Sequence, residues 1–285
     1  MYEAFFGFRE PPFSLTPDPR FLWLSDTHQE GLATLVYGIT RHKGFLLLTG
    51  EVGTGKTTLL RAALSQIPPD TDTALVLNTV GLTPMDLLKL IAAEFGIEGK
   101  LESTADYIIA LNRMLLERLR MGRNTVLIID EAQNLDQETL EEVRLLSNLE
   151  TDTSKLMQIV LTGQPELLRM LSSPALRQLR QRIAVEHHME PLVLEEIRHY
   201  LAHRMAVAGA KFEEVFEDDV EQPFYEFSRG CPRLISLLAD RVLLSAYAKG
   251  LKPIGADFVE QKAKAMEGIR QASLPTSPEA GVPRG

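Results

Sequence analysis

One stretch of the chain has the residue types and spacing of a phosphate-binding loop. Gly50 and Gly55 enclose four free positions and are followed by Lys56 and Thr57. In such a loop, backbone N–H groups surround the β- and γ-phosphates, the lysine supplies positive charge, and the hydroxyl holds Mg²⁺. The residues expected to bind a nucleoside triphosphate with Mg²⁺ are Gly50, Glu51, Val52, Gly53, Thr54, Gly55, Lys56, Thr57 and Thr58.

The sequence on either side of this loop supports the assignment. Residues 45–48 are apolar and predict a short buried strand, and residues 58–64 predict a helix. The positive end of that helix dipole points at the phosphates. A chance glycine-rich turn is the alternative, and the flanking strand and helix disfavour it.

A second motif suggests hydrolysis as well as binding. The apolar run 125–129 ends in two carboxylates, Asp130 and Glu131. A strand buried on both faces has such a continuous apolar run, and ligands bind at the carboxyl ends of parallel strands. Asp130 is then placed to hold Mg²⁺ and Glu131 to orient and polarise the attacking water. A strand capped by two solvated acids is the alternative, disfavoured by the phosphate loop 74 positions upstream (130 minus 56).

Composition limits the class of protein. The 285 residues are 45% apolar and 24% charged, as in globular proteins, and no apolar run approaches the length of a membrane span. No signal peptide is apparent at the amino terminus, and the single cysteine, Cys231, excludes an intramolecular disulfide. We therefore expect a cytoplasmic protein.

The net charge of −9 argues against a protein that coats nucleic acid by neutralising phosphates. A local basic patch, the three arginines within residues 177–182, keeps nucleic-acid binding open.

Strand and helix patterns alternate through the first two thirds of the chain. Strands are expected at 45–48, 74–78, 125–129, 156–162 and 183–188, and helices at 26–40, 58–64, 84–95, from 103, and at 137–149. This alternation predicts an α/β domain with a parallel, three-layer sheet over residues 1–191. Its aromatic and proline-rich lead-in, residues 1–30, is expected to lie on that core.

The pattern changes to helices alone from about Leu192. Expected helices at 194–208, 218–228, 233–249 and 256–268 predict a small all-helical lid domain over residues 192–268. Residues 269–285 contain three prolines and lack a core pattern, so a disordered tail is expected.

An α/β phosphate-loop domain followed by a helical lid resembles the AAA+ ATPases. More specifically, residues 1–268 resemble the AAA+ domain of the general secretion pathway A proteins, in a superfamily that includes transposition ATPases. The resemblance rests on the runs at 5–20, 50–58, 129–134, 161–167, 179–183 and 230–233. It implies ATP binding and hydrolysis with Mg²⁺ in a nucleotide-dependent homo-oligomer.

The resemblance also implies roles for residues outside the two motifs. Gln164, or alternatively Thr162, looks like the sensor that contacts the γ-phosphate or attacking water. Arg233 looks like the lid arginine that links the lid to the nucleotide. Arg182 and Arg180 resemble arginine fingers that complete a neighbour's active site. Local alternatives are a helix-initiating turn at Gln164, a solvated arginine at 233, and a basic surface helix or nucleic-acid contact at 180–182.

Two biological roles are consistent with these features. The first is an ATP-driven oligomer that assembles or remodels a cell-envelope secretion complex, with the protein at the inner membrane through a partner. The second is a DNA-associated ATPase that acts as a transposition- or initiator-type switch. A nucleotide-gated adaptor with little turnover is disfavoured by Glu131.

Four other residues could suggest a metal or ligand site, but the sequence favours purely structural positions for them. His199 and His203, four positions apart, are expected on a solvated lid face rather than at a metal. Trp23 is expected in the core, with an adenine-contacting wall as the alternative, and Cys231 in a lid loop.

Overall fold

The computed structural model describes residues 1–77, 79–151 and 154–268, and they divide into two compact units. An α/β unit consists of Leu24–Gly50 and Lys56–Glu190. A helical unit consists of Met1–Trp23, Glu51–Gly55 and the chain from Pro191 onward. The expected tail, residues 269–285, lies outside the described residues.

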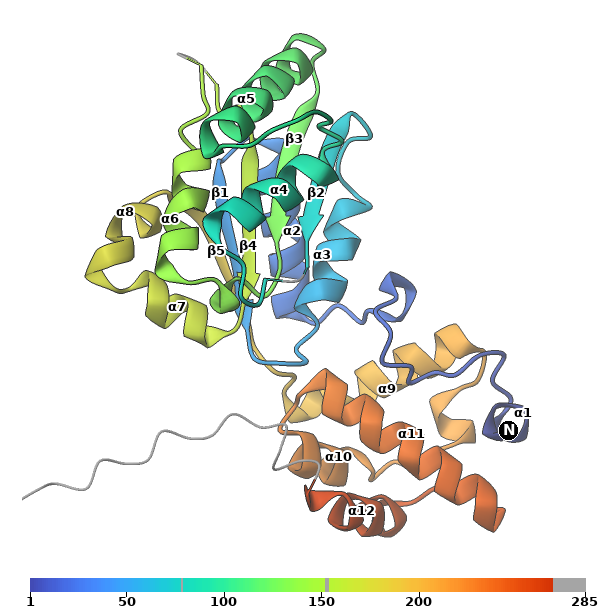
Figure 1. Cartoon of the computed structure of the whole chain (residues 1–285). Coiled ribbons are helices and arrows are strands. Elements are labelled where there is room, and N and C mark those ends of the chain that lie inside the picture. The colour runs from blue at the N-terminus through green and yellow to red at the C-terminus, as the bar shows by residue number, and fades with distance from the viewer. Residues whose placement is uncertain (78, 152–153, 269–285) are drawn as a thin grey trace, which may run out of the picture. The chain divides into compact units, whose positions relative to one another are not determined.

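A five-stranded parallel sheet forms the centre of the α/β unit (Figure 1). The strand order is β2-β3-β4-β1-β5, and every adjacent pair is parallel, so the predicted α/β fold is confirmed. The strands are β1 (Phe45–Gly50), β2 (Thr71–Val76), β3 (Asn124–Ile129), β4 (Gln158–Gly163) and β5 (Ile183–Met189).

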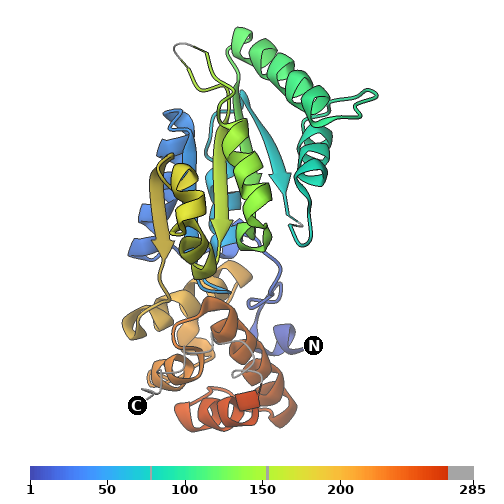
Figure 2. The same ribbon diagram turned by 60° about the vertical axis from the view of Figure 1, so that its left-hand side comes forward.

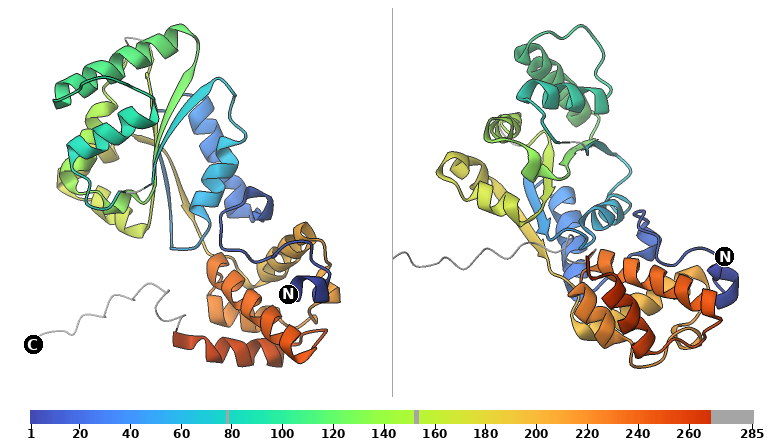
Figure 3. Two further views of the ribbon diagram at one scale, coloured as in Figure 1. Left: turned by 45° about the vertical axis from the view of Figure 1, so that its right-hand side comes forward. Right: turned by 60° about the horizontal axis from the view of Figure 1, so that its bottom comes forward.

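Helices cover both faces of this sheet, which makes three layers (Figure 3). Leu46 points toward α2, where a Cβ on Gly38 would lie 2.3 Å from its Cδ2. Phe45 and Leu47 pack on the opposite side in the apolar cluster that includes residues of α4, α5 and α6. One layer contains α2 (Asp26–Thr40) and α3 (Lys56–Leu64); the other contains α4 (Pro84–Glu94), α5 (Thr104–Arg120) and α6 (Gln137–Leu146).

Helix starts in this unit follow local capping chemistry. Thr83 and Ser103 each accept a hydrogen bond from the backbone N–H three residues later, and Asp86 and Asp106 close the two capping boxes. These starts match the sequence-based expectation. Two further short helices, α7 (Pro165–Leu171) and α8 (Arg177–Arg180), correspond to the alternatives of a helix-initiating turn at Gln164 and a basic surface helix near residue 180.

Strand β2 begins three residues before the apolar run that predicted it. Its polar start includes Asp72, whose carboxylate forms ion pairs with Arg123 and, at 3.2 Å, with Arg118. The hydrogen bond from Arg123, with Arg118 nearby, holds the pKa of Asp72 below its usual value. An apolar pattern does not reveal a strand start that is stabilised by ion pairs.

The helical unit has its own apolar core. Its main helices are α9 (Leu194–Ala208), α10 (Glu221–Ser228), α11 (Pro232–Lys249) and α12 (Ala256–Ala265), and α12 packs on α10 and α11 (Figure 2). At the turn before α11, Gly230 has φ +77°, and a Cβ there would lie 1.9 Å from the carbonyl oxygen of Leu192. None of the helices within the described ranges is long and apolar enough to cross a membrane.

The lead-in packs into the core of the helical unit, whereas the sequence analysis placed it on the α/β core. It begins with α1 (Tyr2–Phe6). The hydroxyl of Tyr2 donates to Asp240 Oδ1 at 2.5 Å, and burial together with Asp240 raises the pKa of Tyr2 well above its usual value. The lead-in residues in this core are all aromatic: Tyr2, Phe6, Phe8, Phe13 and Phe21. A five-residue helix and scattered aromatic residues carry no period that identifies their packing partner.

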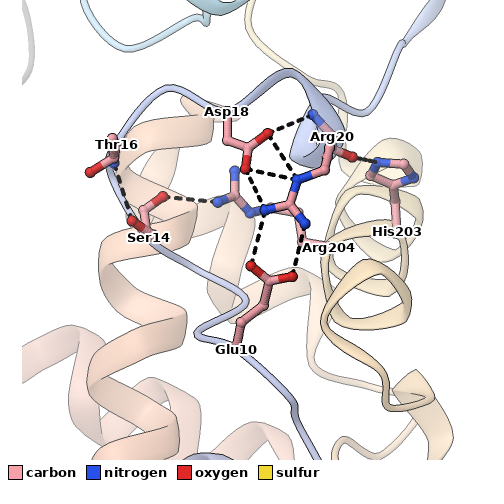
Figure 4. A network of polar contacts seen from close by, with 7 residues as sticks. All are labelled: Glu10, Ser14, Thr16, Asp18, Arg20, His203 and Arg204. Carbon is pink, nitrogen blue, oxygen red and sulfur yellow. Dashed lines mark hydrogen bonds and ion pairs between the residues drawn. The ribbon is translucent and has the colours of Figure 1, made fainter.

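Arg204 on α9 binds the lead-in through hydrogen bonds and a cation–π contact (Figure 4). Its guanidinium donates to the carbonyl oxygens of Pro12 at 2.8 Å and Ser14 at 2.9 Å. The same group lies 5.2 Å from the ring centre of Phe21, a cation–π distance. A second arginine of the network, Arg20, binds the carboxylates of Glu10 and Asp18.

Replacing Arg204 with methionine should release the lead-in. The methionine keeps an apolar stem, but the hydrogen bonds to Pro12 and Ser14 are lost, and bonds from a charged donor contribute roughly 1.5–3 kcal/mol. Trp23, the only tryptophan, stacks on His199 with ring centres 6.0 Å apart. We expect red-shifted Trp23 emission and faster proteolysis within the lead-in.

The matched control is Arg241→Met on α11, since Arg241 is exposed and makes no hydrogen bond or ion pair within the described residues. Trp23 emission that is the same in Arg204→Met and in the control would show that the lead-in is held without Arg204.

Candidate nucleotide-binding site

The phosphate loop connects the end of β1 to the start of α3, as the sequence predicts. Gly53 and Gly55 have φ values of +84° and +98°, which only glycine adopts easily. The hydroxyl of Thr54 donates to the carbonyl oxygen of Glu51 at 2.9 Å and closes the turn. Because α3 begins at Lys56, the N–H groups of its first turn would face an anion bound in the loop.

Lys56 is buried beside this loop. The residue is only 5% exposed, and its Nζ donates to the carbonyl oxygen of Gly50 at 2.8 Å. A buried ammonium group is costly unless an anion balances it, and a phosphate supplies that balance. The position of Lys56 therefore fits the predicted phosphate contact.

The Asp130 carboxylate, at the end of β3, is the next component of the site. Its Oδ2 accepts a hydrogen bond from Thr57 Oγ1 at 2.9 Å, and its Oδ1 accepts one from the N–H of Glu131 at 2.9 Å. Thr162 Oγ1 also donates to Oδ1. The β3–β4 register pairs Ile129 with Leu161, which places Thr162 beside Asp130.

Thr57 and Asp130 together fit a Mg²⁺–nucleotide site. They offer two hard oxygens at neighbouring positions, and Mg²⁺ in such sites takes one or two protein oxygens, with phosphates and water completing its shell. No cluster of three or more His, Cys, Asp or Glu side chains suited to a metal occurs within the part of the chain that the structure describes.

Glu131 adopts an uncommon backbone conformation. Its φ of +53° and ψ of +41° are left-handed, which costs a non-glycine residue about 1–3 kcal/mol. The hydroxyl of Thr79 and the N–H of Asn134 both donate to the Glu131 carbonyl oxygen, at 2.9 and 3.0 Å. These bonds hold the backbone of the turn that follows β3.

Two glutamines bind the Glu131 carboxylate. Gln164 Nε2 donates to Oε2 at 3.1 Å, so the structure brings together the predicted catalytic base and the predicted sensor. Gln133 Nε2 donates to the same oxygen. Gln164 is also the N-cap residue of α7, so the helix-initiating role and the contact with Glu131 coexist.

Sequence reasoning missed Gln133 and Thr79, and it considered Thr162 only as an alternative sensor. In the structure Thr162 binds Asp130 and Gln164 binds Glu131. The available signal was position, because polar residues that directly follow parallel strands meet at one edge of the sheet.

Within the helical unit, the turn before α11 contacts the loop segment Glu51–Gly55. The N–H of Arg233 donates to the carbonyl oxygen of Gly53 at 3.2 Å, and Cys231 Sγ donates to the carbonyl oxygen of Val52 at 3.3 Å. Arg233 is exposed, and its guanidinium makes no hydrogen bond or ion pair with any residue in the described ranges. The residue predicted to sense nucleotide thus lies against the phosphate loop.

The two arginines predicted to reach a neighbour are engaged within their own unit. Arg182 donates to Asn148 Oδ1 at 2.6 Å and to Ser147 Oγ, and Arg180 forms an ion pair with Glu186 at 2.6 Å. Use of either arginine in another subunit requires these contacts to break.

The fold and site define a class of protein. A family model described as an AAA domain matches residues 39–171, and the chain has the fold of an AAA+ P-loop protein. It is 45% identical over 271 residues, 95% of its length, to general secretion pathway protein A of Aeromonas hydrophila. The chain spans about half (49%) of that relative.

Solved structures show the same fold. The Cdc6p protein of Pyrobaculum aerophilum has a TM-score of 0.69 at 18% identity, covering 93% of this chain and 74% of that one. The ORC2 protein of Aeropyrum pernix, in ADPNP–ADP complexes, has a TM-score of 0.66 at 18% identity, with 90% and 72% covered. The RuvB branch migration motor of Thermotoga maritima scores 0.55 at 19% identity, with 84% and 69% covered. At such identities the likeness establishes the fold alone.

Gly53→Ala should weaken nucleotide binding. A Cβ at Gly53 would lie 2.6 Å from Arg233 Cβ and 2.9 Å from Cys231 Sγ, so the loop must shift away from its present conformation. We expect the dissociation constant of an ATP analogue to rise at least about tenfold, a loss of roughly 1.4 kcal/mol, measured by calorimetric titration.

Gly250→Ala is the matched control for Gly53→Ala. Gly250 also has a positive φ, +63°, but nothing lies within 4 Å of a Cβ there. This variant should lose about 1 kcal/mol of stability and keep the parental affinity. Equal affinities in all three proteins would show that the Gly53 contact does not shape the loop.

Proposed function

We propose that this protein binds Mg²⁺–ATP, hydrolyses it, and acts as a nucleotide-dependent homo-oligomer that assembles or remodels a cell-envelope secretion complex. The observation that supports hydrolysis best is the Glu131 carboxylate. It lies at the carboxyl edge of the sheet, next to the Asp130–Thr57 pair, and is oriented by Gln164.

Binding is assigned to the phosphate loop and its neighbours. The loop N–H groups and Lys56 bind the β- and γ-phosphates, and Thr57 with Asp130 holds the metal. Bound Mg²⁺ supplies positive charge that offsets the negative charge shifting among the phosphoryl oxygens in the transition state.

Hydrolysis is assigned to Glu131 as the residue that orients and polarises water. Two glutamine amides occupy its Oε2, and Oε1 takes no hydrogen bond from any residue in the described ranges. Oε1 is therefore the oxygen that accepts a hydrogen bond from the water. Gln164, bound to Glu131, serves as the sensor of the γ-phosphate, and Arg233 links the helical unit to the nucleotide.

Two substitutions separate binding from hydrolysis. Lys56→Ala should abolish ATP binding in a titration, because it removes the ammonium group from an anion site. Glu131→Gln should keep Mg²⁺–ATP affinity and lower turnover by about 100-fold or more, because shape is kept while water polarisation is lost. Hydrolysis by Glu131→Gln at the parental rate would show that Glu131 is not the base.

The oligomer is proposed to share active sites through Arg182, with Arg180 as the second candidate. Arg182→Ala should bind ATP nearly normally and hydrolyse it slowly, because the finger acts mainly in the transition state. Parental specific activity should rise with protein concentration, and Arg182→Ala mixed with Lys56→Ala should recover part of it.

An active site shared between subunits requires the protein to form an oligomer. Concentration-independent turnover by a protein that sediments as a monomer would contradict it. An Arg177→Ala variant is the matched control, because Arg177 is exposed on α8, five residues before Arg182, and makes no hydrogen bond or ion pair among the described residues.

The cell-envelope role is supported by the identity to general secretion pathway protein A and by the net charge of −9. A protein partner at the inner membrane and a cytoplasmic location belong to the same proposal. A pull-down from the native host with Glu131→Gln, which traps the ATP state, tests it. Recovery of envelope proteins supports the role.

The DNA-associated alternative rests on the arginines at 177–182. Arg180 and Arg182 already bind Glu186 and Asn148, which leaves Arg177 as the unengaged member of the cluster. ATPase stimulation by duplex DNA, with binding that falls steeply as salt rises, would favour this alternative over the envelope role.

A further inference from the structure

The Gln133 side chain joins two parts of the site. It lies in the short 3₁₀ turn Ala132–Asn134 that follows Glu131. Its Nε2 donates to Glu131 Oε2, and its Oε1 accepts a hydrogen bond from the backbone N–H of Gln164 at 3.1 Å. One amide thus connects the turn after β3 to the residue that follows β4.

The end of strand β4 leaves space for the Gln133 amide. A Cβ on Gly163 would lie 2.8 Å from Gln133 Oε1, so glycine at this position leaves the space that the amide occupies. Gln133 and Gln164 both direct an Nε2 group at Glu131 Oε2. Gln164 therefore reaches Glu131 twice, once directly and once through Gln133.

Glu131 needs such support because its own backbone does not fix the carboxylate. The residue has a left-handed conformation, and the bonds to its carbonyl oxygen from Thr79 and Asn134 hold the backbone only. With both amides on Oε2, the carboxylate has one orientation, in which Oε1 is left for water. Loss of Gln133 removes one of the two donors and also the support of the Gln164 backbone.

We propose that Gln133 is a positioning residue for the hydrolytic step: it fixes the orientation of the Glu131 carboxylate and makes that orientation depend on the end of strand β4. This inference rests on the proposed ATPase activity, with Glu131 as the base. Because Gln133 acts through Glu131, it affects turnover and leaves ATP binding unchanged.

The test compares two substitutions of Gln133 in the full chain. Gln133→Met keeps the length of the side chain and removes both hydrogen bonds. General bases contribute about 100- to 10,000-fold to turnover, so misdirecting one should lower kcat at least about tenfold, with KM for ATP unchanged. Gln133→Glu keeps an acceptor for the Gln164 N–H but places a second carboxylate beside Glu131. This variant keeps the bond to Gln164 and loses the donor to Glu131 Oε2, so kcat should fall while KM for ATP stays unchanged.

A double substitution separates positioning from general damage. In a Glu131→Gln background, Gln133→Met should cause little further loss of single-turnover rate, because residues that act as a unit are not additive. If Gln133→Met lowered the single-turnover rate by the same factor in the parental protein and in Glu131→Gln, the proposal would be overturned. Gln137→Met, on the exposed first residue of α6, is the control for a glutamine-to-methionine change and should keep parental turnover.

The failure of this inference differs from the failure of the proposed function. Parental kcat in both Gln133 variants, with an inactive Glu131→Gln, would exclude the positioning role and leave the ATPase intact. Parental turnover in Glu131→Gln would instead remove the base, and the positioning role with it. If Gln133→Met loses ATP affinity or circular-dichroism signal, the kcat of Gln133→Glu decides, and parental turnover there contradicts the proposal.

Discussion

The buried carboxylate of Asp130 is the constraint on which the rest of the site depends. This residue is 4% exposed at the end of a strand buried on both faces, and a charge in such a place is tolerated only with close donors. Thr57 supplies one donor from α3, Thr162 a second from β4, and the N–H of Glu131 a third. The third bond draws the backbone back on itself directly after Asp130. The same group that suits a metal therefore also sets the turn on which Glu131 lies.

Neighbouring strands then determine which side chains meet. Parallel register brings the ends of β2, β3 and β4 to one edge, so the residues that follow them are in contact although they are distant in sequence. Thr79 follows β2 and binds the Glu131 backbone, and Gln164 follows β4 and binds its carboxylate. Residues that follow three different strands therefore meet at Glu131, at its backbone or at its carboxylate. The left-handed backbone of Glu131 makes the arrangement sensitive, because the conformation persists only while its neighbours hold it.

Features governed by local chemistry were predictable from sequence, and features governed by packing were not. The phosphate loop, the parallel sheet and the helix starts at Thr83 and Ser103 follow from periodicity and capping residues close in the chain. The packing position of the lead-in does not follow from its sequence, because aromatic residues can pack on any apolar surface. The contact of Gln133 with Gln164 depends on a side-chain rotamer and on the space that Gly163 leaves, and neither has a sequence period. For the same reason the sequence offered both Thr162 and Gln164 as sensors, and only the strand register separates their contacts.

The packing of the lead-in also has a consequence for folding during synthesis. Phe21 belongs to the same apolar core as Met266, 245 residues later in the chain. At about 5–20 residues per second, the ribosome completes that core on the order of 10–50 s after the lead-in has been made. Throughout this interval five aromatic side chains lack their partners, while the α/β unit between them is already complete enough to fold. The nascent chain therefore presents an apolar, aggregation-prone segment early, and chaperones that bind such segments have a long interval in which to act on this one.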